Sequence, residues 1–256
     1  MAKDSAKSFP PGMEPIGEGH FAFDCHPGVE CFTVCCRQVD LTLYPYDIIR
    51  LKHALGLDSE VFLRRHVRLV RGDNPFFPEV KLVLTEDDPP VCPFLGEAGC
   101  QVYDSRPTAC RSYPLERAVG RKDASTRPEE HYFIVRHPYC LGHAEAKLCT
   151  VVGWLRSQRL LADNAVNDLW VEMDTLFAGN PWKGEGAAGE KQQLAFMVCY
   201  NIDGFRRFAD QQQLVQQFAL GKEERRRIAR DDVELLKFGW QWLKRILTGR
   251  SALRKK

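Results

Sequence analysis

The stretch FDCHPGVECFTVCC, residues 23–36, places Cys25, Cys31, Cys35 and Cys36 within twelve positions. Pro and Gly follow the first of these cysteines and break regular structure, so we expect the stretch to be a loop. Thiolates are soft ligands that hold zinc in tetrahedral sites and iron in iron–sulfur clusters. The stretch therefore predicts a metal site on a loop.

A second group of cysteines lies in CPFLGEAGCQVYDSRPTACRSYP, residues 92–114, and Cys140 follows in HPYCLGH, residues 137–143. The spacings C-x5-C-x3-C-C and C-x7-C-x9-C match neither the zinc-finger knuckle nor the bacterial ferredoxin run. Eight clustered thiols exceed the four that one tetrahedral ion needs. The pattern leaves open two centres, one polynuclear centre, or a set with spare thiols.

Two cysteines and two histidines stand apart from these groups. Cys199 lies in the apolar run FMVCY, which is typical of a small buried side chain. For Cys149 the sequence favours neither a role as metal ligand nor a role as core residue. His26 and His143 could supply a nitrogen ligand, but we favour a solvated or packing role for each.

The hydrophobic pattern predicts short elements followed by longer helices. A hairpin should bring Cys92 and Cys100 together, and Ser105 should cap a short helix that carries Cys110. In chain order we expect a strand at 39–43, a helix from Pro45 to Gly56, a helix from Asp58 through Leu69 and Val70, strands at 80–84, 91–95 and 100–103, the short helix, and strands at 115–119 and 131–135.

From about Cys140 onward, helical patterns dominate, including one with Leu148 and Val151 on the same face. A glycine-rich loop at 179–190 should separate them from helices at 191–219 and 222–248, the first divided near Gly204. The expected fold is α+β. Its divisions are a flexible leader at 1–20, a cysteine-rich domain of short strands and helices at 21–145, and a helical region packed on it at 146–256.

The composition is that of a globular protein of 256 residues with 44% hydrophobic residues and a formal net charge of +2. That charge gives no reason to expect nucleic-acid binding. The chain has no apolar run of 18 residues and no secretory signal, so we expect a cytoplasmic protein without a transmembrane segment. In a reducing cytoplasm, clustered cysteines favour metal coordination over disulfides.

Positive charge is concentrated at residues 221–256, which hold twelve Lys and Arg against five Asp and Glu. Leu235, Phe238, Trp242 and Ile246 recur there at helical spacing. A basic amphipathic helix can bind a membrane, a nucleic acid or an acidic partner, but we favour packing on its own domain with solvated charges. A protein partner for this region stays open.

The segments FDCHPGVECFTVCC, YPYDIIRL at 44–51 and CPFLGEAGCQVYDSRPTACRSYP, with Cys140 downstream, resemble the YkgJ-type cysteine-cluster family of zinc- or iron-chelating domains, the CxxCxxCC type. The likeness spans about residues 21–145, and C-x-x-Y-x-x-R-P-x-x-C-R at 100–111 is its most specific part. The gap between Cys25 and Cys31 is wider than in many members. The resemblance implies eight metal ligands: Cys25, Cys31, Cys35, Cys36, Cys92, Cys100, Cys110 and Cys140.

The family is related to flagellin lysine N-methylases, which implies an iron–sulfur cluster, or several iron or zinc ions, as a redox or protein-methylating centre. Arg106 and Arg111 flank Cys110, where their charge would offset that of a thiolate-bound cofactor. The sequence contains no phosphate loop, H-E-x-x-H or G-x-S-x-G motif, so it names no reaction. The alternative is a structural zinc or iron site in a protein-interaction or metal-carrier module without catalysis.

Overall fold

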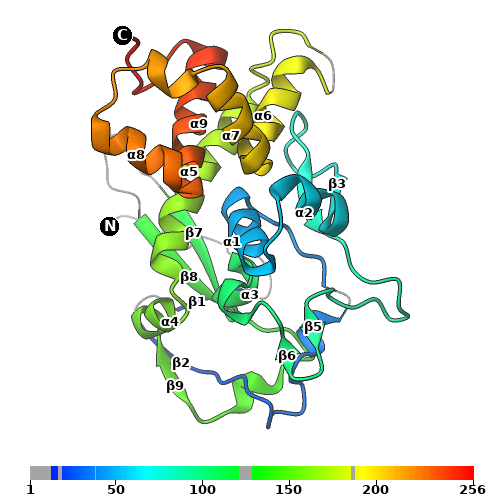
Figure 1. Ribbon diagram of the computed structural model, residues 1–256. Helices are drawn as coiled ribbons and strands as arrows, with labels where there is room; N and C mark the ends of the chain where they lie inside the picture. The colour runs from blue at the N-terminus through cyan, green and yellow to red at the C-terminus, as the bar shows by residue number, and fades with distance from the viewer. Residues whose placement is uncertain (1–12, 17–18, 38, 121–128, 186–187) are drawn as a thin grey trace, which may run out of the picture. The chain divides into compact units, whose positions relative to one another are not determined.

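The structure, a computed structural model, describes residues 13–16, 19–37, 39–120, 129–185 and 188–256 (Figure 1). It confirms the α+β class, with small antiparallel sheets and a helical C-terminal region. The residues group into two compact units, each built from two stretches of chain. The first unit takes 1–37 and 108–161, and the second takes 38–107 and 162–256.

The first unit contains two small sheets and the loop that carries four cysteines. One sheet has the order β1-β8-β7, with Leu115 paired to Ile134, and the other pairs β2 with β9. Its elements are β1 Met13–Pro15, β2 His20–Ala22, η1 Val34–Cys36, α3 Thr108–Ser112, β7 Leu115–Gly120, β8 Glu129–Val135, η3 Leu141–Ala144, β9 Leu148–Thr150 and α4 Val151–Ser157.

Apolar side chains from these short elements form one core in the first unit. Phe23 lies at its centre, 2% exposed, with its ring 5.5 Å from that of Trp154 and perpendicular to it. Burial of such aromatic surface supplies most of the stabilisation available to a unit with so little regular structure. The buried members are Phe21, Phe23, Leu115, Tyr132, Ile134, Val151, Leu155 and Leu160.

The second unit is mainly helical. Asp58 caps α2 by accepting from the Glu60 amide at 2.8 Å, as predicted. Its elements are α1 Pro45–Leu55, α2 Ser59–His66, β3 Val67–Val70, β4 Glu79–Leu82, β5 Leu95–Gly96, β6 Gly99–Cys100, η2 Tyr103–Ser105, α5 Leu160–Ala178 from residue 162, α6 Glu190–Tyr200, α7 Ile202–Gln211, η4 Leu214–Gln217, α8 Lys222–Arg230 and α9 Asp232–Thr248.

Helix α9 packs against α6, α7 and α8 (Figure 1). A Cβ at Gly239 would lie 2.6 Å from Val198 and 2.7 Å from the Phe205 ring, so only glycine permits this close approach. Leu235, Phe238 and the other large apolar side chains of α9 are mostly buried. The packing interpretation of the basic C-terminal helix is therefore confirmed for its apolar face.

Several predicted boundaries were wrong. Leu69 and Val70 were expected in the second helix but lie in β3, because 67–70 pairs with β4 in register from Val67–Leu82 to Val70–Glu79. Sheet pairing here overrides local helical spacing. The expected strand at 39–43 pairs with β4 only as an isolated bridge at Thr42 and two backbone hydrogen bonds.

The predicted hairpin is present but short, and the strands expected at 115–119 and 131–135 pair with each other as β7 and β8. β5 begins only at Leu95, because Pro93 has no N–H to give to a ladder, and it pairs with β6 through Leu95 and Cys100. The helix carrying Cys110 begins at Thr108, after Pro107, whereas Ser105 belongs to η2. The turn between β7 and β8, at 121–128, lies outside the described residues.

Helices of the C-terminal half are shorter and more numerous than expected. The segment 191–219 divides at Asn201, whose side chain accepts from the Gly204 amide at 3.0 Å and so caps α7. Leu148 lies in β9 and is exposed, so it does not share a helical face with Val151. Strand pairing with β2 explains this difference.

Most of the predicted leader at 1–20 lies outside the described residues, but Met13–Pro15 within it form β1. The two units interleave along the chain, whereas the domains predicted at 21–145 and 146–256 are consecutive. That division stays a prediction. Among the described residues, no helix is long and apolar enough to cross a membrane.

A buried charge network joins α1, α7 and α9. The Lys52 ammonium, 5% exposed, lies 3.0 Å from Asp203 and 2.9 Å from Asp232. Asp232 also pairs with Arg206 at 2.7 Å and with His53 at 2.8 Å. Burial alone would raise the pKa of Asp232, but hydrogen bonds from Arg206, Lys52 and His53 outweigh it and lower the pKa to about 2.

We predict that Asp232→Asn lowers the free energy of unfolding by roughly 2–4 kcal/mol at pH 7, because it removes the carboxylate that buried Lys52 shares with Arg206. The folded-state pKa of Asp232 is depressed, so its stabilisation is present above about pH 4 and is lost as the pH falls toward 2. Denaturant melts at pH 7 and pH 2.5 should show the difference from wild type shrinking. Asp40→Asn, at an exposed pair, should cost less than about 1 kcal/mol. An Asp232→Asn difference independent of pH would contradict the account.

Candidate metal centre

Six of the eight predicted ligands lie in the first unit. Cys25 and Cys35 are exposed, and Cys31, Cys36, Cys110 and Cys140 are partly buried. The other two, Cys92 and Cys100, lie in the second unit.

The loop carrying four of these thiols is wound by short-range backbone hydrogen bonds. The Val29 amide donates to the His26 carbonyl and the Val34 amide to that of Cys31, each at 3.0 Å. Val29 is 6% exposed and anchors the loop. These bonds make successive tight turns rather than a regular helix, which agrees with the predicted loop.

Backbone groups of residues 140–142 hold this loop. The Leu141 amide donates to the Cys31 sulfur at 3.1 Å, and the Gly142 carbonyl accepts from the Asp24 amide at 3.1 Å. These contacts join positions about 110 residues apart in the sequence. Cys140 is therefore brought beside the first cysteine group.

The pKa of Tyr139 is affected by the same cysteines. The pKa of its phenol is raised, first by burial and then by the neighbouring Cys35, Cys140 and Cys36 thiols. Negative charge on these thiolates would disfavour the phenolate form of Tyr139. Cys31 thus contacts the residue after Cys140, and Cys35 and Cys36 lie in the same loop, near enough to Tyr139 to affect its ionisation.

A stack of three rings lies behind Cys140. The Tyr113 ring is 5.3 Å from His137, and His137 is 5.1 Å from Tyr139, with interplanar angles of 10° and 9°. Burial and a hydrogen bond with Cys140 raise the pKa of Tyr113. The stack therefore links Tyr113 to His137 and Tyr139, just before Cys140.

In the second unit, Cys100 lies in the β5–β6 hairpin and Cys92 opens the turn before it. Cys100 pairs with Leu95, whose amide donates to the Cys92 carbonyl at 3.0 Å. The hairpin that the sequence predicted for these two cysteines is therefore present.

The two arginines near Cys110 have different surroundings. Arg111 is 5% exposed, and its guanidinium donates to the Gln158 carbonyl. Arg106 donates to the Tyr103 carbonyl at 3.0 Å and lies over the Tyr103 ring, 3.7 Å from its centroid. Both are held by the protein, as positioned cations should be. Their role in binding a cofactor stays a prediction.

The remaining cysteines behave as packing residues. Cys199 is 1% exposed, as predicted, and burial raises the pKa of its thiol. Burial also raises the pKa of Cys149, whose thiol lies 3.5 Å from the Phe23 carbonyl. Both environments favour the neutral thiol, which is a poor metal ligand.

The two histidines also have protein contacts. His143 lies 3.0 Å from the Tyr113 hydroxyl, and its ring packs 5.2 Å from that of Phe23. His26 accepts from the Gly28 amide at 3.1 Å and lies 3.8 Å from Glu145. These contacts support the packing interpretation of His143 and the solvated interpretation of His26.

The donor chemistry of the loop and of Cys140 suits a thiophilic metal, because soft sulfur ligands select zinc, iron and copper(I). Among the described residues, no group of three or more His, Cys, Asp or Glu side chains is arranged to hold a metal ion. The candidate centre is defined by the approach of Cys140 to the cysteine loop and by the backbone hydrogen bonds of Leu141 and Gly142 that hold the two together.

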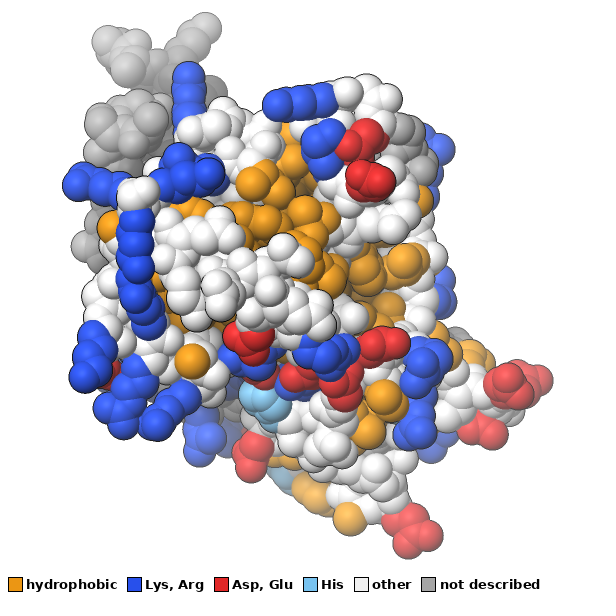
Figure 2. Space-filling view, turned by 45° about the horizontal axis from the view of Figure 1, so that its top comes forward, with side chains coloured by type: hydrophobic (Ala, Val, Ile, Leu, Met, Phe, Trp, Pro, Cys, Tyr) orange, Lys and Arg blue, Asp and Glu red, His pale blue; other side chains and the backbone are white. Residues whose placement is uncertain are grey.

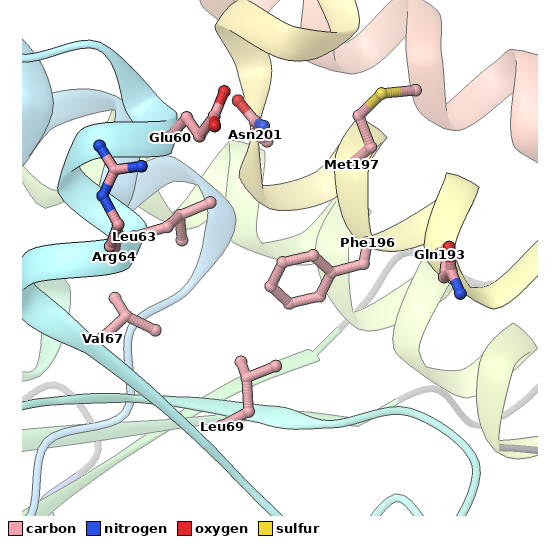
Figure 3. A pocket seen from close by; sticks show the side chains of 9 residues that line it. All are labelled: Glu60, Leu63, Arg64, Val67, Leu69, Gln193, Phe196, Met197 and Asn201. Carbon is pink, nitrogen blue, oxygen red and sulfur yellow. The ribbon is translucent and has the colours of Figure 1, made fainter. Parts of the chain in front are cut away.

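A separate groove lies in the second unit between α2, β3 and α6, with a volume of about 420 Å³ (Figure 3). Leu63, Leu69 and Phe196 give it an apolar lining, and Glu60 at its rim pairs with Arg207 at 3.4 Å. No cysteine or histidine lines it. The cysteine group remains the candidate site.

The site is thus a group of thiols on a small α+β scaffold. Residues 24–141 match the family model named CxxCxxCC, described as a "putative zinc- or iron-chelating domain", which confirms the resemblance. Neither a comparison with curated proteins nor one with solved structures gave a match.

The sequence did not predict the roles of Leu141 and Gly142, which hold the cysteine loop in place. Leu141 acts through its backbone amide, which no motif marks, and Gly142 through its lack of a side chain. A Cβ at Gly142 would lie 2.5 Å from the Asp24 carbonyl oxygen and 2.9 Å from the Phe23 ring. The available signal was the run HPYCLGH, where aromatic residues and a glycine surround the cysteine.

We predict that Gly142→Ala lowers stability by about 1–3 kcal/mol and reduces the bound metal, because the new Cβ pushes the Asp24 backbone away from residues 140–142. Denaturant melts and metal analysis measure the two effects. Gly221→Ala is the control, since nothing lies within 4 Å of its Cβ; because Gly221 caps α8, the variant should cost no more than about 1 kcal/mol and should keep its metal content. Equal behaviour of the two variants would contradict the proposed role of Gly142.

Proposed function

We propose that this chain is a metal protein whose clustered thiolates hold an iron–sulfur cluster or several iron or zinc ions. The observation that carries the proposal is the hydrogen bond from the Leu141 amide to the Cys31 sulfur, which brings the loop of Cys31, Cys35 and Cys36 beside Cys140. The matched family, described as zinc- or iron-chelating, supports metal binding in general. The full ligand set we propose is Cys25, Cys31, Cys35, Cys36, Cys92, Cys100, Cys110 and Cys140.

The chain's own groups suit an anionic thiolate centre. The Leu141 amide already donates to one sulfur, and the Tyr113 side chain hydrogen-bonds with Cys140. Arg106 and Arg111 would offset thiolate charge, which is how neighbouring cations stabilise such centres. When bound, the centre would supply either electron transfer or a structural clamp. A cytoplasmic location would keep the thiols reduced.

Two uses of the centre are distinguished by the metal it holds. A redox or protein-methylating centre, as in the related flagellin lysine N-methylases, calls for iron with inorganic sulfide and for binding of S-adenosylmethionine. A structural or carrier site calls for zinc held by a closed set of four thiolates per ion.

We predict that protein purified without oxygen contains metal, and that Cys31→Ser and Cys140→Ser each lose most of it because a thiolate ligand is removed. Elemental analysis, acid-labile sulfide and the visible spectrum provide the measurement. Iron with sulfide identifies a cluster, and colourless protein with zinc identifies the structural alternative. Cys199→Ala should keep the full metal content, since that thiol is buried elsewhere. Metal content unaffected by the first two variants would contradict the proposal.

A second candidate function, binding of an acidic protein partner, is favoured by a cationic surface of the second unit. Lys and Arg side chains line the left edge of Figure 2. Seven exposed cations in α8 and near the C-terminus have no carboxylate within 4 Å among the described residues. This basic surface comprises Lys222, Arg226, Arg230, Arg250, Arg254, Lys255 and Lys256.

Residues 218 and 219 connect the two parts of the basic surface, α8 and the C-terminal residues, through hydrogen bonds. The Ala219 amide donates to the Arg254 carbonyl at 2.8 Å, and Arg225 of α8 donates to the Phe218 carbonyl at 3.1 Å. Ile246 is the single exposed large apolar side chain in 217–256. A surface without aromatic platforms or apolar wedges fits an acidic polypeptide better than a single-stranded nucleic acid or a membrane.

We predict that the chain binds poly-glutamate at low salt and that reversing Arg254, Lys255 and Lys256 to Glu weakens the binding, because the attraction is electrostatic. Fluorescence titration at increasing salt measures it. Reversal of Arg64, Arg65 and Lys183, all exposed cations, is the matched control. Equal losses in the two triple variants, or stronger binding of duplex DNA than of poly-glutamate, would contradict a specific acidic-protein surface.

A further inference from the structure

The Leu141 amide occupies an unusual position among the backbone groups of the candidate centre. Its nitrogen lies 3.1 Å from the Cys31 sulfur, and it directly follows Cys140. One peptide group therefore carries a proposed ligand on its N-terminal side and a donor to a second proposed ligand on its C-terminal side.

The orientation of this peptide is fixed from both sides. The Cys140 amide donates to the His137 carbonyl at 2.9 Å, and the Gly142 carbonyl accepts from Asp24 at 3.1 Å. Residues 141–144 form η3, entered from extended backbone at Cys140 with φ −90° and ψ 111°. The Leu141 N–H thus has little freedom to turn away from Cys31.

The side chain of Leu141 contributes little to this contact. It is 44% exposed, whereas Gly142 beside it is buried. The interaction with Cys31 is made by the main chain, so replacing the leucine side chain should leave it intact. This separation allows the hydrogen bond to be tested without disturbing a packed side chain.

A donor to a metal-bound sulfur has two physical effects. It orients the ligand before the metal arrives, and it withdraws charge from the thiolate afterwards. Hydrogen bonds to ligand sulfurs are among the factors that set the electronic properties of thiolate-bound centres.

We propose that the Leu141 backbone N–H is a positioning donor of the metal centre, which holds Cys31 in place beside Cys140 and tunes the charge of the Cys31 thiolate. The inference rests on the proposed metal-binding function and deepens it. It makes Leu141 a positioning residue rather than a ligand, through an atom that no side-chain substitution removes.

The direct test is an amide-to-ester exchange at Leu141 in the full chain, which replaces N–H by O and keeps the side chain. Co²⁺ is the probe, because its sulfur-to-metal charge-transfer band reports thiolate ligation. We expect Co²⁺ affinity to fall about tenfold, as for loss of other supports of metal ligands. The band should move to lower energy, because the sulfur regains charge. A purely structural role would not shift the band.

Three controls isolate the hydrogen bond. Leu141→Ala keeps the N–H and should bind Co²⁺ like the wild type. An amide-to-ester exchange at Leu57, whose amide donates to the Lys52 carbonyl at 2.9 Å in the second unit, removes a comparable backbone bond elsewhere. In metal-free protein, the Leu141 exchange should lower stability when Cys31 is present and have less effect in Cys31→Ala, which removes the accepting sulfur.

A second measurement needs no backbone variant. In protein loaded with ¹¹³Cd²⁺, an N–H···S bond to a ligating sulfur transmits a scalar coupling from the metal to the amide proton. We expect this coupling at the Leu141 amide and its loss in Cys31→Ser.

The outcomes separate the inference from the function on which it rests. Wild-type protein that shows the charge-transfer band, with an unchanged affinity and band after the Leu141 exchange, overturns the inference and leaves metal binding standing. Absence of the ¹¹³Cd coupling at Leu141 in loaded protein does the same. Wild-type protein that binds neither metal through sulfur overturns the proposed function together with the inference.

Discussion

The candidate centre depends on the docking of one irregular loop on the backbone of residues 140–142. The loop at 24–36 contains no α-helix or sheet strand, so its own hydrogen bonds cannot give its thiols fixed directions. Hydrogen bonds from the Asp24 amide to Gly142 and from the Leu141 amide to Cys31 supply that constraint. The buried Phe23 ring and the absence of a side chain at Gly142 make the approach close enough.

Much of this arrangement could be predicted from sequence because it depends on local chemistry. Pro27 and Gly28 predicted a loop, Pro45 and Asp58 predicted the starts of α1 and α2, and the glycines after residue 95 predicted a hairpin. Capping, proline geometry and turn preferences act within a few residues, so they can be read from one sequence. The family resemblance had the same basis and is confirmed over residues 24–141.

The parts that sequence could not supply depend on distant partners. Leu69 fits a helical spacing and yet lies in β3, because β4 offers it a pairing partner. Leu148 also fits a helical spacing but lies in β9, because it pairs with β2. The ammonium of Lys52 pairs with carboxylates on α7 and α9, two helices that come much later in the chain. The Leu141 amide is invisible to any motif, since every residue but proline has one. Backbone atoms and long-range pairing thus account for the differences.

The most direct test of the account is X-ray absorption at the edge of the metal found in protein purified without oxygen. The account predicts a first shell dominated by sulfur, at about 2.3 Å for zinc. It also predicts that this sulfur shell is lost in Cys31→Ser and Cys140→Ser and kept in Cys199→Ala. A first shell of nitrogen and oxygen alone, or a sulfur shell that survives loss of both Cys31 and Cys140, would contradict the assignment of the centre to these thiols.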